Sequence, residues 1–205
     1  MTTTRPPAAP IVASRLAVAA ALALALAGCV NLGGGKVPPT LFTLTAATAA
    51  PAGQTVTGTA DTALVVLEPE ADRAIAVQRV AVTIDPSNVA YLKDAAWAEP
   101  PSRLFRHLLA ETLRARGTRL VFEDTDATAS GRQRLGGRLL AFGYDAATRA
   151  ALVRYDAMRE GPGGAITTRR FEASVPVSKA AAARVAPALN QAANQVAAEV
   201  ADWVG

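Results

Sequence analysis

The sequence predicts an α+β fold in which two helices pack on one face of a mainly antiparallel sheet. Strand-like segments outnumber helix-like ones along the 205 residues. The last strands form a C-terminal three-stranded meander, expected at about 133–144, 149–159 and 165–176. Apolar residues recur with the helical period in two other stretches, about 101–116 and 179–204. An antiparallel sheet can leave its second face to solvent, so helices on one face suffice.

The N-terminal segment has the pattern of an export signal. Arg5 and Arg15 are its only charges, and the apolar run at 16–27 is shorter than the roughly 20 residues that a membrane-spanning helix needs. The sequence LAGC that follows resembles the bacterial lipobox. That resemblance implies cleavage between Gly28 and Cys29 and several acyl chains on Cys29, which would anchor the chain to a membrane. A plain secretory signal with a chance cysteine, or a core cysteine, are the alternatives.

The chain is therefore expected to divide into a signal peptide at 1–28, a lipidated tether at 29–39 and a single α+β domain at 40–205. Loss of the two signal arginines lowers the net charge from +4 to +2, too little to indicate nucleic-acid binding. The tether is rich in Gly and Pro, and about ten residues reach at most roughly 35 Å. We expect the domain to stay near its membrane.

Strand signals dominate the first half of the domain. The stretch TLFTLT at 40–45 predicts a short strand, and the continuous apolar run at 63–69 predicts a buried one. A further strand is expected at 76–83. The turn-forming residues 85–88 follow it, so residues 89–92 are expected to return as its hairpin partner.

The first helix, expected at 101–116, starts with prolines, which the first turn of a helix accepts because the N–H is unpaired there. Its apolar stripe consists of Leu104, Phe105, Leu108, Leu109, Thr112 and Leu113. The polar residues expected on the opposite, solvent-facing side are Arg103, Arg106, Glu111 and Arg114. Gly117 predicts the end of the helix, and a strand is expected at 119–124.

The meander and the last helix carry their own signals. Residues 161–164 predict a turn between the last two strands, and the adjacent apolar pair Leu139 and Leu140 indicates a bulge in the first strand. Ser178 is expected to cap the final helix. Pro187 removes one helical hydrogen bond, so we expect a kink or a restart there.

The sequence predicts no enzyme, no metal site and no cofactor. His107, the only histidine, is expected on the surface of a helix rather than in a Ser-His-acid triad. A zinc centre needs several Cys or His ligands, and the chain lacks them once Cys29 is lipidated. The acidic run at 123–126 lacks the pattern of a calcium loop and is interpreted as a solvated turn. Glu68 and Glu70 are interpreted as rim residues rather than paired catalytic carboxylates.

Arginines gather on or beside the expected meander. Because a sheet with helices on one side exposes its other side, some of these arginines are candidates for a partner-binding face, which suits an acidic protein or anionic head groups. These candidates are Arg138, Arg154, Arg169 and Arg170. Acidic residues are interspersed among them, which favours the other interpretation, an ordinary solvated face.

Residues 88–113, NVAYLKDAAWAEPPSRLFRHLLAETL, carry a resemblance to a known family. An aromatic-x-Leu strand at 42–44 precedes this stretch, which itself holds a strand with a tyrosine and a Trp-Ala-x-Pro helix start. This order resembles that of the ABC-type transport auxiliary lipoprotein family, which includes paraquat-inducible intermembrane transport lipoproteins. The motif residues, interpreted as structural, are Phe42, Leu44, Tyr91, Trp97, Ala98 and Pro100. From its position alone, Trp97 is expected to pack on the first turn of the helix that follows.

The resemblance implies a non-catalytic auxiliary lipoprotein of an MCE/ABC-type envelope phospholipid transport system, acting as a docking or acceptor subunit for an MCE-domain protein. It would be anchored to the outer membrane and face the periplasm. Val30 favours that membrane, because Asp after the cysteine is the inner-membrane retention signal in enteric bacteria. A structural or assembly lipoprotein that supports insertion of outer-membrane components is the main alternative; an exported hydrolase and a lipid carrier are others. The lipid, the direction, the partner-binding face and the oligomeric state stay open.

Overall fold

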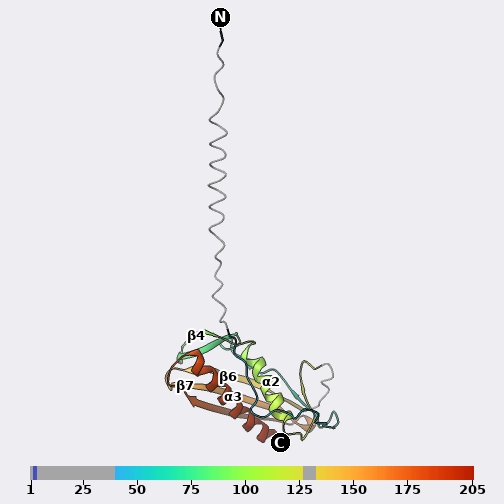
Figure 1. Ribbon diagram of the computed structural model, residues 1–205. Coiled ribbons are helices and arrows are strands. Elements are labelled where there is room, and N and C mark those ends of the chain that lie inside the picture. The colour runs from blue at the N-terminus through green and yellow to red at the C-terminus, as the bar shows by residue number, and fades with distance from the viewer. Residues whose placement is uncertain (1, 4–39, 127–132) are drawn as a thin grey trace. The chain divides into compact units, whose positions relative to one another are not determined.

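The computed structural model describes residues 2–3, 40–126 and 133–205, and those from 40 onward belong to one compact unit, Pro38–Gly205 (Figure 1). The expected signal peptide, with Gly28, and the tether, with Cys29, lie outside the described residues. None of the described helices is long and apolar enough to cross a membrane.

The described part of the unit contains eight strands and two longer helices. The strands are β1 (Leu64–Val66), β2 (Glu70–Ala71), β3 (Arg79–Asp85), β4 (Asn88–Ala96), β5 (Val121–Glu123), β6 (Gln133–Asp145), β7 (Ala150–Glu160) and β8 (Ile166–Pro176). The helices are α2 (Pro101–Arg114), α3 (Ala182–Val204) and the short 3₁₀ turn η1 (Pro162–Gly164). Figure 1 shows α2 and α3 side by side across one face of the sheet.

The α+β class and the C-terminal meander are confirmed, whereas the mainly antiparallel sheet is matched only in part. Strands β6, β7 and β8 are antiparallel along their whole length, and so are β3 and β4. Strands β1, β2 and β3, however, all run parallel to β6 along its other edge, and β5 runs parallel to β1. The sheet is therefore mixed. A short buried apolar run such as 63–69 carries no local sign of the direction of its partner.

Side chains alternate across β7 as expected for a sheet covered on one side. Ala151, Val153 and Tyr155 are buried beneath the helices, whereas Arg154 and Met158 point to the uncovered side. We call that uncovered side the open face. The register of β6 and β7 shifts between Leu139 and Ala141, which confirms the bulge expected near Leu139.

The two helices begin and end close to the expected residues. Pro100 precedes α2 in an extended conformation, and no side chain caps that end. The residue that caps α3 is Ala181 rather than Ser178, so the expected cap is wrong. Helix α3 continues through Pro187 without a restart. Pro187 is exposed, so water can satisfy the carbonyl group that lost its helical partner.

The core contains a chain of aromatic rings packed edge to face. Trp97, with only 1% of its surface exposed, lies with its ring centroid 5.5 Å from that of Phe142 and 6.1 Å from that of Phe42. Phe105 of α2 continues the chain to Phe142 at 6.4 Å and to Tyr155 of β7 at 5.2 Å. Such pairs stabilise the fold beyond the effect of the apolar area they bury, because the edge of one ring faces the electron-rich face of another. The chain joins α2 to the centre of the sheet.

Candidate functional site

Three of the motif residues expected to be structural, Phe42, Trp97 and Ala98, meet in the structure. The main-chain N–H of Phe42 donates to the carbonyl oxygen of Ala96, and the N–H of Ala98 donates to the carbonyl oxygen of Phe42, both at 2.8 Å. This isolated parallel bridge between Phe42 and Trp97 replaces the strand expected at 40–45. Trp97 packs on Phe42 and Phe142.

The other motif residues have separate surroundings. Leu44 is partly buried against the core, and Pro100 stands directly before α2. Tyr91 lies on β4, where the Arg79 guanidinium stacks over its ring at 4.0 Å, and it takes no part in the Trp97 cluster.

A strap formed by residues 42–50 then crosses the helices and is held by amide side chains. The N–H of Thr45 donates to Oδ1 of Asn190 at 2.9 Å, and the N–H of Ala47 donates to Oδ1 of Asn194 at 2.7 Å. Asn194 also donates from Nδ2 to the carbonyl oxygen of Thr45 at 2.9 Å. Asn190 and Asn194 are one helical turn apart, so they meet alternate residues of the strap. Sequence reasoning missed these contacts because the partners lie about 145 positions apart.

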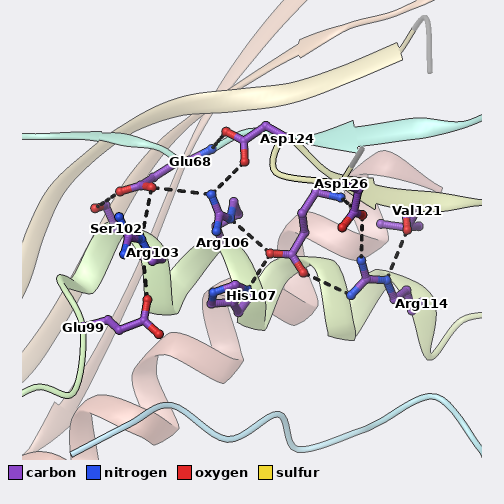
Figure 2. Close-up of polar contacts among 11 residues, drawn as sticks. Glu68, Glu99, Ser102, Arg103, Arg106, His107, Arg114, Val121, Asp124 and Asp126 are labelled. Carbon is purple, nitrogen blue, oxygen red and sulfur yellow. Dashed lines mark hydrogen bonds and ion pairs between the residues drawn. The ribbon is translucent and has the colours of Figure 1, made fainter. Parts of the chain in front are cut away.

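A network of ion pairs fastens α2 to the strands beside it (Figure 2). Arg106 is its centre: its Nε lies 3.1 Å from Oε2 of Glu123, and its Nη1 lies 2.7 Å from Oδ1 of Asp124 and 3.5 Å from Oε2 of Glu68. Arg114 adds a contact of 3.2 Å to Oε1 of Glu123. We call the five residues the α2 charge cluster.

Arg106 and Glu123 are buried, with 3% and 8% of their surfaces exposed. The expectation that Arg106 faces solvent is therefore wrong. Of the run 123–126, expected as a solvated turn, Glu123 instead ends β5 and is buried, whereas Asp124 and Thr125 do form an exposed turn. Nothing local distinguishes Arg106 from Arg103, because two residues three positions apart share a helix face. Only the approach of β5 and of the chain after β1 covers Arg106, whereas the Arg103 side chain stays half exposed.

No catalytic arrangement is apparent among the described residues. The side chain of His107 is 46% exposed and its Nδ1 contacts Oε2 of Glu123. Ser102 donates from Oγ to Oε1 of Glu68 at 2.7 Å, so the serine and the histidine have different carboxylate partners. Within the same part of the chain, no group of three or more His, Cys, Asp or Glu side chains could hold a metal ion.

Charged side chains cross the open face in register. Glu70 of β2, Arg138 of β6, Asp156 of β7 and Arg170 of β8 stand directly opposite one another, with alternating signs. Nε of Arg170 lies 2.6 Å from Oδ1 of Asp156, and Nε of Arg138 lies 3.9 Å from Oε2 of Glu70. We call these four residues the open-face charge row. A hydrogen bond from Arg170 is the main cause that lowers the pKa of Asp156, and the positive charges of Arg170, Arg154 and Arg138 add to it.

Three of the four arginines expected on a partner face share the open face. Arg154 pairs there with Glu172 beside the charge row, which contains Arg138 and Arg170. Arg169 does not join them: its guanidinium lies 5.0 Å from the centre of the Phe171 ring, which packs against α3. Adjacent residues of a strand point to opposite faces, so Arg169 and Arg170 separate.

A groove of about 770 Å³ lies on the open face beside the charge row. The four residues of the charge row form part of its lining, together with Leu67, Gly136, Gly137, Met158 and Thr168. In the register Gly136, Met158 and Thr168 stand opposite one another, between the charge row and a second pair, Arg134 opposite Glu160. The groove is thus a mainly apolar strip bounded by charges. Met158, with 43% of its surface exposed, supplies its largest hydrophobic side chain on β7.

The shape of the groove depends on glycines in β6. Gly137 has a φ of 134°, and a Cβ atom there would lie 2.0 Å from the main-chain oxygen of Asp156. A Cβ atom on Gly136 would lie 3.3 Å from the Leu67 side chain. Any side chain at 137 would displace β7, and one at 136 would crowd the strip. Sequence reasoning did not single out this pair.

Comparisons with known proteins agree with this fold. The sequence profile of the family described as ABC-type transport auxiliary lipoprotein component matches residues 42–201, which is most of the chain. A search of curated proteins finds no match.

Solved structures resemble the fold more than the sequence. A crystal structure of a DUF330-family protein from Xanthomonas campestris is 22% identical, covers 80% of this chain and 94% of its own, and gives a TM-score of 0.67. A crystal structure of an uncharacterized protein is 14% identical, covers 81% of this chain and 100% of its own, and gives a TM-score of 0.61. At these identities the likeness extends to the fold alone.

Proposed function

The chain belongs to the family of ABC-type transport auxiliary lipoprotein components, and from that membership we propose that it is the docking or acceptor subunit of an MCE/ABC-type envelope phospholipid transport system. As a family member it is an auxiliary transport component of the cell envelope. In the proposal it is non-catalytic, anchored to the outer membrane through Cys29, and faces the periplasm. The ATPase belongs to other subunits.

The N-terminal sequence supports the anchoring part of the proposal. The lipobox-like LAGC at 26–29 follows a basic, then apolar segment, and two or more acyl chains hold a protein on a bilayer far more firmly than one. The tether that follows keeps the domain within roughly 35 Å of its anchor. A partner of the domain would therefore lie at the same membrane surface.

The contrast between the two charge networks supports a docking role rather than catalysis. The α2 charge cluster is engaged in ion pairs that join helix to sheet, and His107 has no serine partner among the described residues. The open face, in contrast, offers an apolar strip beside exposed charges of both signs. Protein interfaces commonly combine an apolar centre with a polar rim. We assign the docking surface to this groove.

Site-specific cross-linking in the native envelope tests the proposal. A photoreactive amino acid replaces Met158 in the groove, and a matched control replaces Glu199, which is exposed on α3. We expect mass spectrometry to recover an MCE-domain protein from the Met158 position and not from the Glu199 position. Recovery of an MCE-domain protein from Glu199 alone would move the docking surface to the helices.

Recovery of only β-barrel or peptidoglycan-associated proteins at both positions would overturn the transport role and favour the assembly-lipoprotein alternative. The anchoring part has its own test. Replacing Cys29 with Ala should release the protein from the outer-membrane fraction of a density gradient. An unchanged distribution would contradict lipid attachment at Cys29.

A further inference from the structure

The apolar strip of the groove runs across the strands rather than along them. Gly136 of β6, Met158 of β7 and Thr168 of β8 stand opposite one another in the register. Leu67 continues the strip on the other side of Gly136, where its side chain lies close to that glycine. Because neighbouring strands are about 4.8 Å apart, these four positions span roughly 14 Å.

The width of the strip is set by the charges on its two sides. Arg138 of the charge row and Arg134 of the second pair border it on β6. They are four residues apart on one strand, so roughly 13 Å separates the two borders. An α-helix with its side chains is about 10 to 12 Å across and fits this width. A single extended chain would leave most of the width empty, since strands lie only about 4.8 Å from their neighbours.

The hydrogen bonding of the sheet also favours a helix as the occupant. Both β6 and β7 already pair with strands on each side, so the main chain beneath the groove has no free edge to offer. An extended chain laid over Met158 and the two glycines would turn its own N–H and C=O groups toward an apolar strip without partners, which is costly. A helix satisfies these groups internally.

The signs of the charge row fit a helix in the same orientation. They alternate from strand to strand, because Glu70, Arg138, Asp156 and Arg170 stand opposite one another in that order. The strand spacing of about 4.8 Å is close to the helical pitch of 5.4 Å. A helix across the strands therefore brings about one residue per turn opposite each member of the row. Charges that alternate in sign at i, i+4 and i+7 would pair with the row, and they also stabilise the helix itself.

We propose that the groove binds an amphipathic α-helix of another protein, with a narrow apolar stripe bordered by charges of alternating sign. The inference rests on the docking role proposed for the groove and names the element that docks there. A second copy of this chain offers no such helix among the described residues, because α2 and α3 bury their apolar sides within the domain. Helices that bind in grooves are held by apolar side chains at i, i+3 or i+4, and i+7.

The spacing of cross-links in the native envelope tests the proposal. A photoreactive amino acid replaces either Met158 or Thr168 in the full-length lipoprotein, and mass spectrometry identifies the partner residues that each position reaches. The two positions lie on adjacent strands, about 5 Å apart. We expect the partner residues to be three or four positions apart, as on one side of a helix. A separation of one or two positions, as in an extended chain, would overturn the proposal.

The same experiment separates this inference from the proposed function. A spacing of three or four residues in a protein other than an MCE-domain protein would keep the helix and overturn the proposed transport partner. An MCE-domain protein with a spacing of one or two residues would keep the docking role and overturn the helix. Adducts to lipid alone from both positions would overturn both.

A synthetic helix tests the chemistry of the strip. The probe is a fluorescent, internally cross-linked helical peptide of about 15 residues, with Leu at i, i+4 and i+7 bordered by alternating Lys and Glu. Fluorescence anisotropy measures its binding to the full-length lipoprotein in phosphatidylcholine nanodiscs. We expect Met158→Asp to weaken binding by about tenfold or more, because it places a charge against the apolar stripe. The matched control Ile84→Asp, at a residue 48% exposed on β3 and outside the groove, should bind like the parent.

A second pair of variants tests the charges. Arg138→Glu interrupts the alternation of the row, and we expect a loss of affinity of about two- to fivefold, as for an exposed ion pair. The control Arg154→Glu lies on the open face but outside the lining of the groove and should bind like the parent. Equal affinities of the parent, Met158→Asp and Arg138→Glu for the peptide would overturn the proposal, and so would a parent protein that does not bind it.

Discussion

The α2 charge cluster and the open-face charge row use the same residue types but lie in different surroundings. In the cluster, Arg106 and Glu123 are nearly without solvent contact, and several partners satisfy each of them. In the row, Arg138, Asp156 and Arg170 stand in solvent on the open face. Breaking one side of a buried pair costs about 3 to 5 kcal/mol, whereas an exposed pair is worth about 0 to 1 kcal/mol. Burial, more than residue type, therefore sets how much each network contributes to stability.

The difference suits the two networks to different tasks. The cluster holds α2 to β5 and to the chain after β1. It thereby also fixes the position of Phe105, which lies on the same helix and packs on Phe142 in the core. The row contributes little to folding, so its charges are free to rearrange toward a partner at low cost. Four variants test this difference, in order of decreasing expected effect.

The largest effect is expected from breaking the cluster with Arg106→Met. The change leaves the buried Glu123 carboxylate with fewer partners, so we expect the free energy of unfolding to fall by about 3 kcal/mol, the lower end for a buried pair because Glu123 keeps His107 and Arg114. Urea unfolding monitored by circular dichroism measures it. Arg103→Met, three residues earlier and half exposed, is the control and should cost less than about 1 kcal/mol. Equal losses would mean that burial does not distinguish the two arginines.

The second variant tests whether the backbone of β6 contributes more to stability at the open face than the charges there do. Gly137→Ala places a Cβ atom against the main-chain oxygen of Asp156 at a positive φ. We expect a loss of about 2 to 3 kcal/mol, typical of an unfavourable backbone conformation that neighbours must accommodate. Gly163→Ala is the control, because its φ is also positive but no atom lies within 4 Å. A loss of stability no greater than that of the control would show that β7 can move away from the added Cβ atom at little cost.

The third variant, Tyr155→Phe, tests the residue that joins the two regions. The Tyr155 ring packs on Phe105 beneath α2, and its hydroxyl donates to the carbonyl oxygen of Gly136 in the groove. The variant leaves that oxygen without this donor, so we expect a loss of about 1 to 2 kcal/mol. Burial raises the pKa of Tyr155, so its phenol should stay protonated where exposed tyrosines ionise. Ultraviolet titration checks this, and ionisation of all three tyrosines near pH 10 would contradict it.

The smallest effect is expected in the charge row. Asp156→Asn should lower stability by less than about 1 kcal/mol at pH 7, because the pair is exposed. The pKa of Asp156 is lower in the folded protein than its ordinary value of 3.8, so its contribution is present above that value and is lost as the pH falls below it. Unfolding curves of both proteins should therefore converge once the pH falls below the lowered pKa of Asp156. A difference that persists there would indicate a structural role of the side chain instead.

Local patterns were enough to predict most elements. The helical stripe of Leu104, Leu108 and Leu113 predicts α2, and the turn at 85–88 predicts the hairpin of β3 and β4; both are confirmed. The meander and its bulge near Leu139 are confirmed as well. The candidate site could be predicted only in part: arginines on the open face were expected, but the groove and the glycines that shape it were not. A groove is a property of neighbouring strands, not of one segment.

The helices and most strands could be predicted from the sequence, because they follow from residue spacings of two to four positions, and the order of the motifs carried the family resemblance. Which charges are buried depends on the tertiary structure. Arg103 and Arg106 share a helix face, yet one is half exposed and the other is enclosed by carboxylates of β5 and of the chain after β1. The same holds for the parallel course of β1, β2 and β3 along β6 and for the meeting of Phe42 with Trp97. Partners so far apart in the chain leave no trace in local periodicity, since their contact depends on how the sheet as a whole assembles.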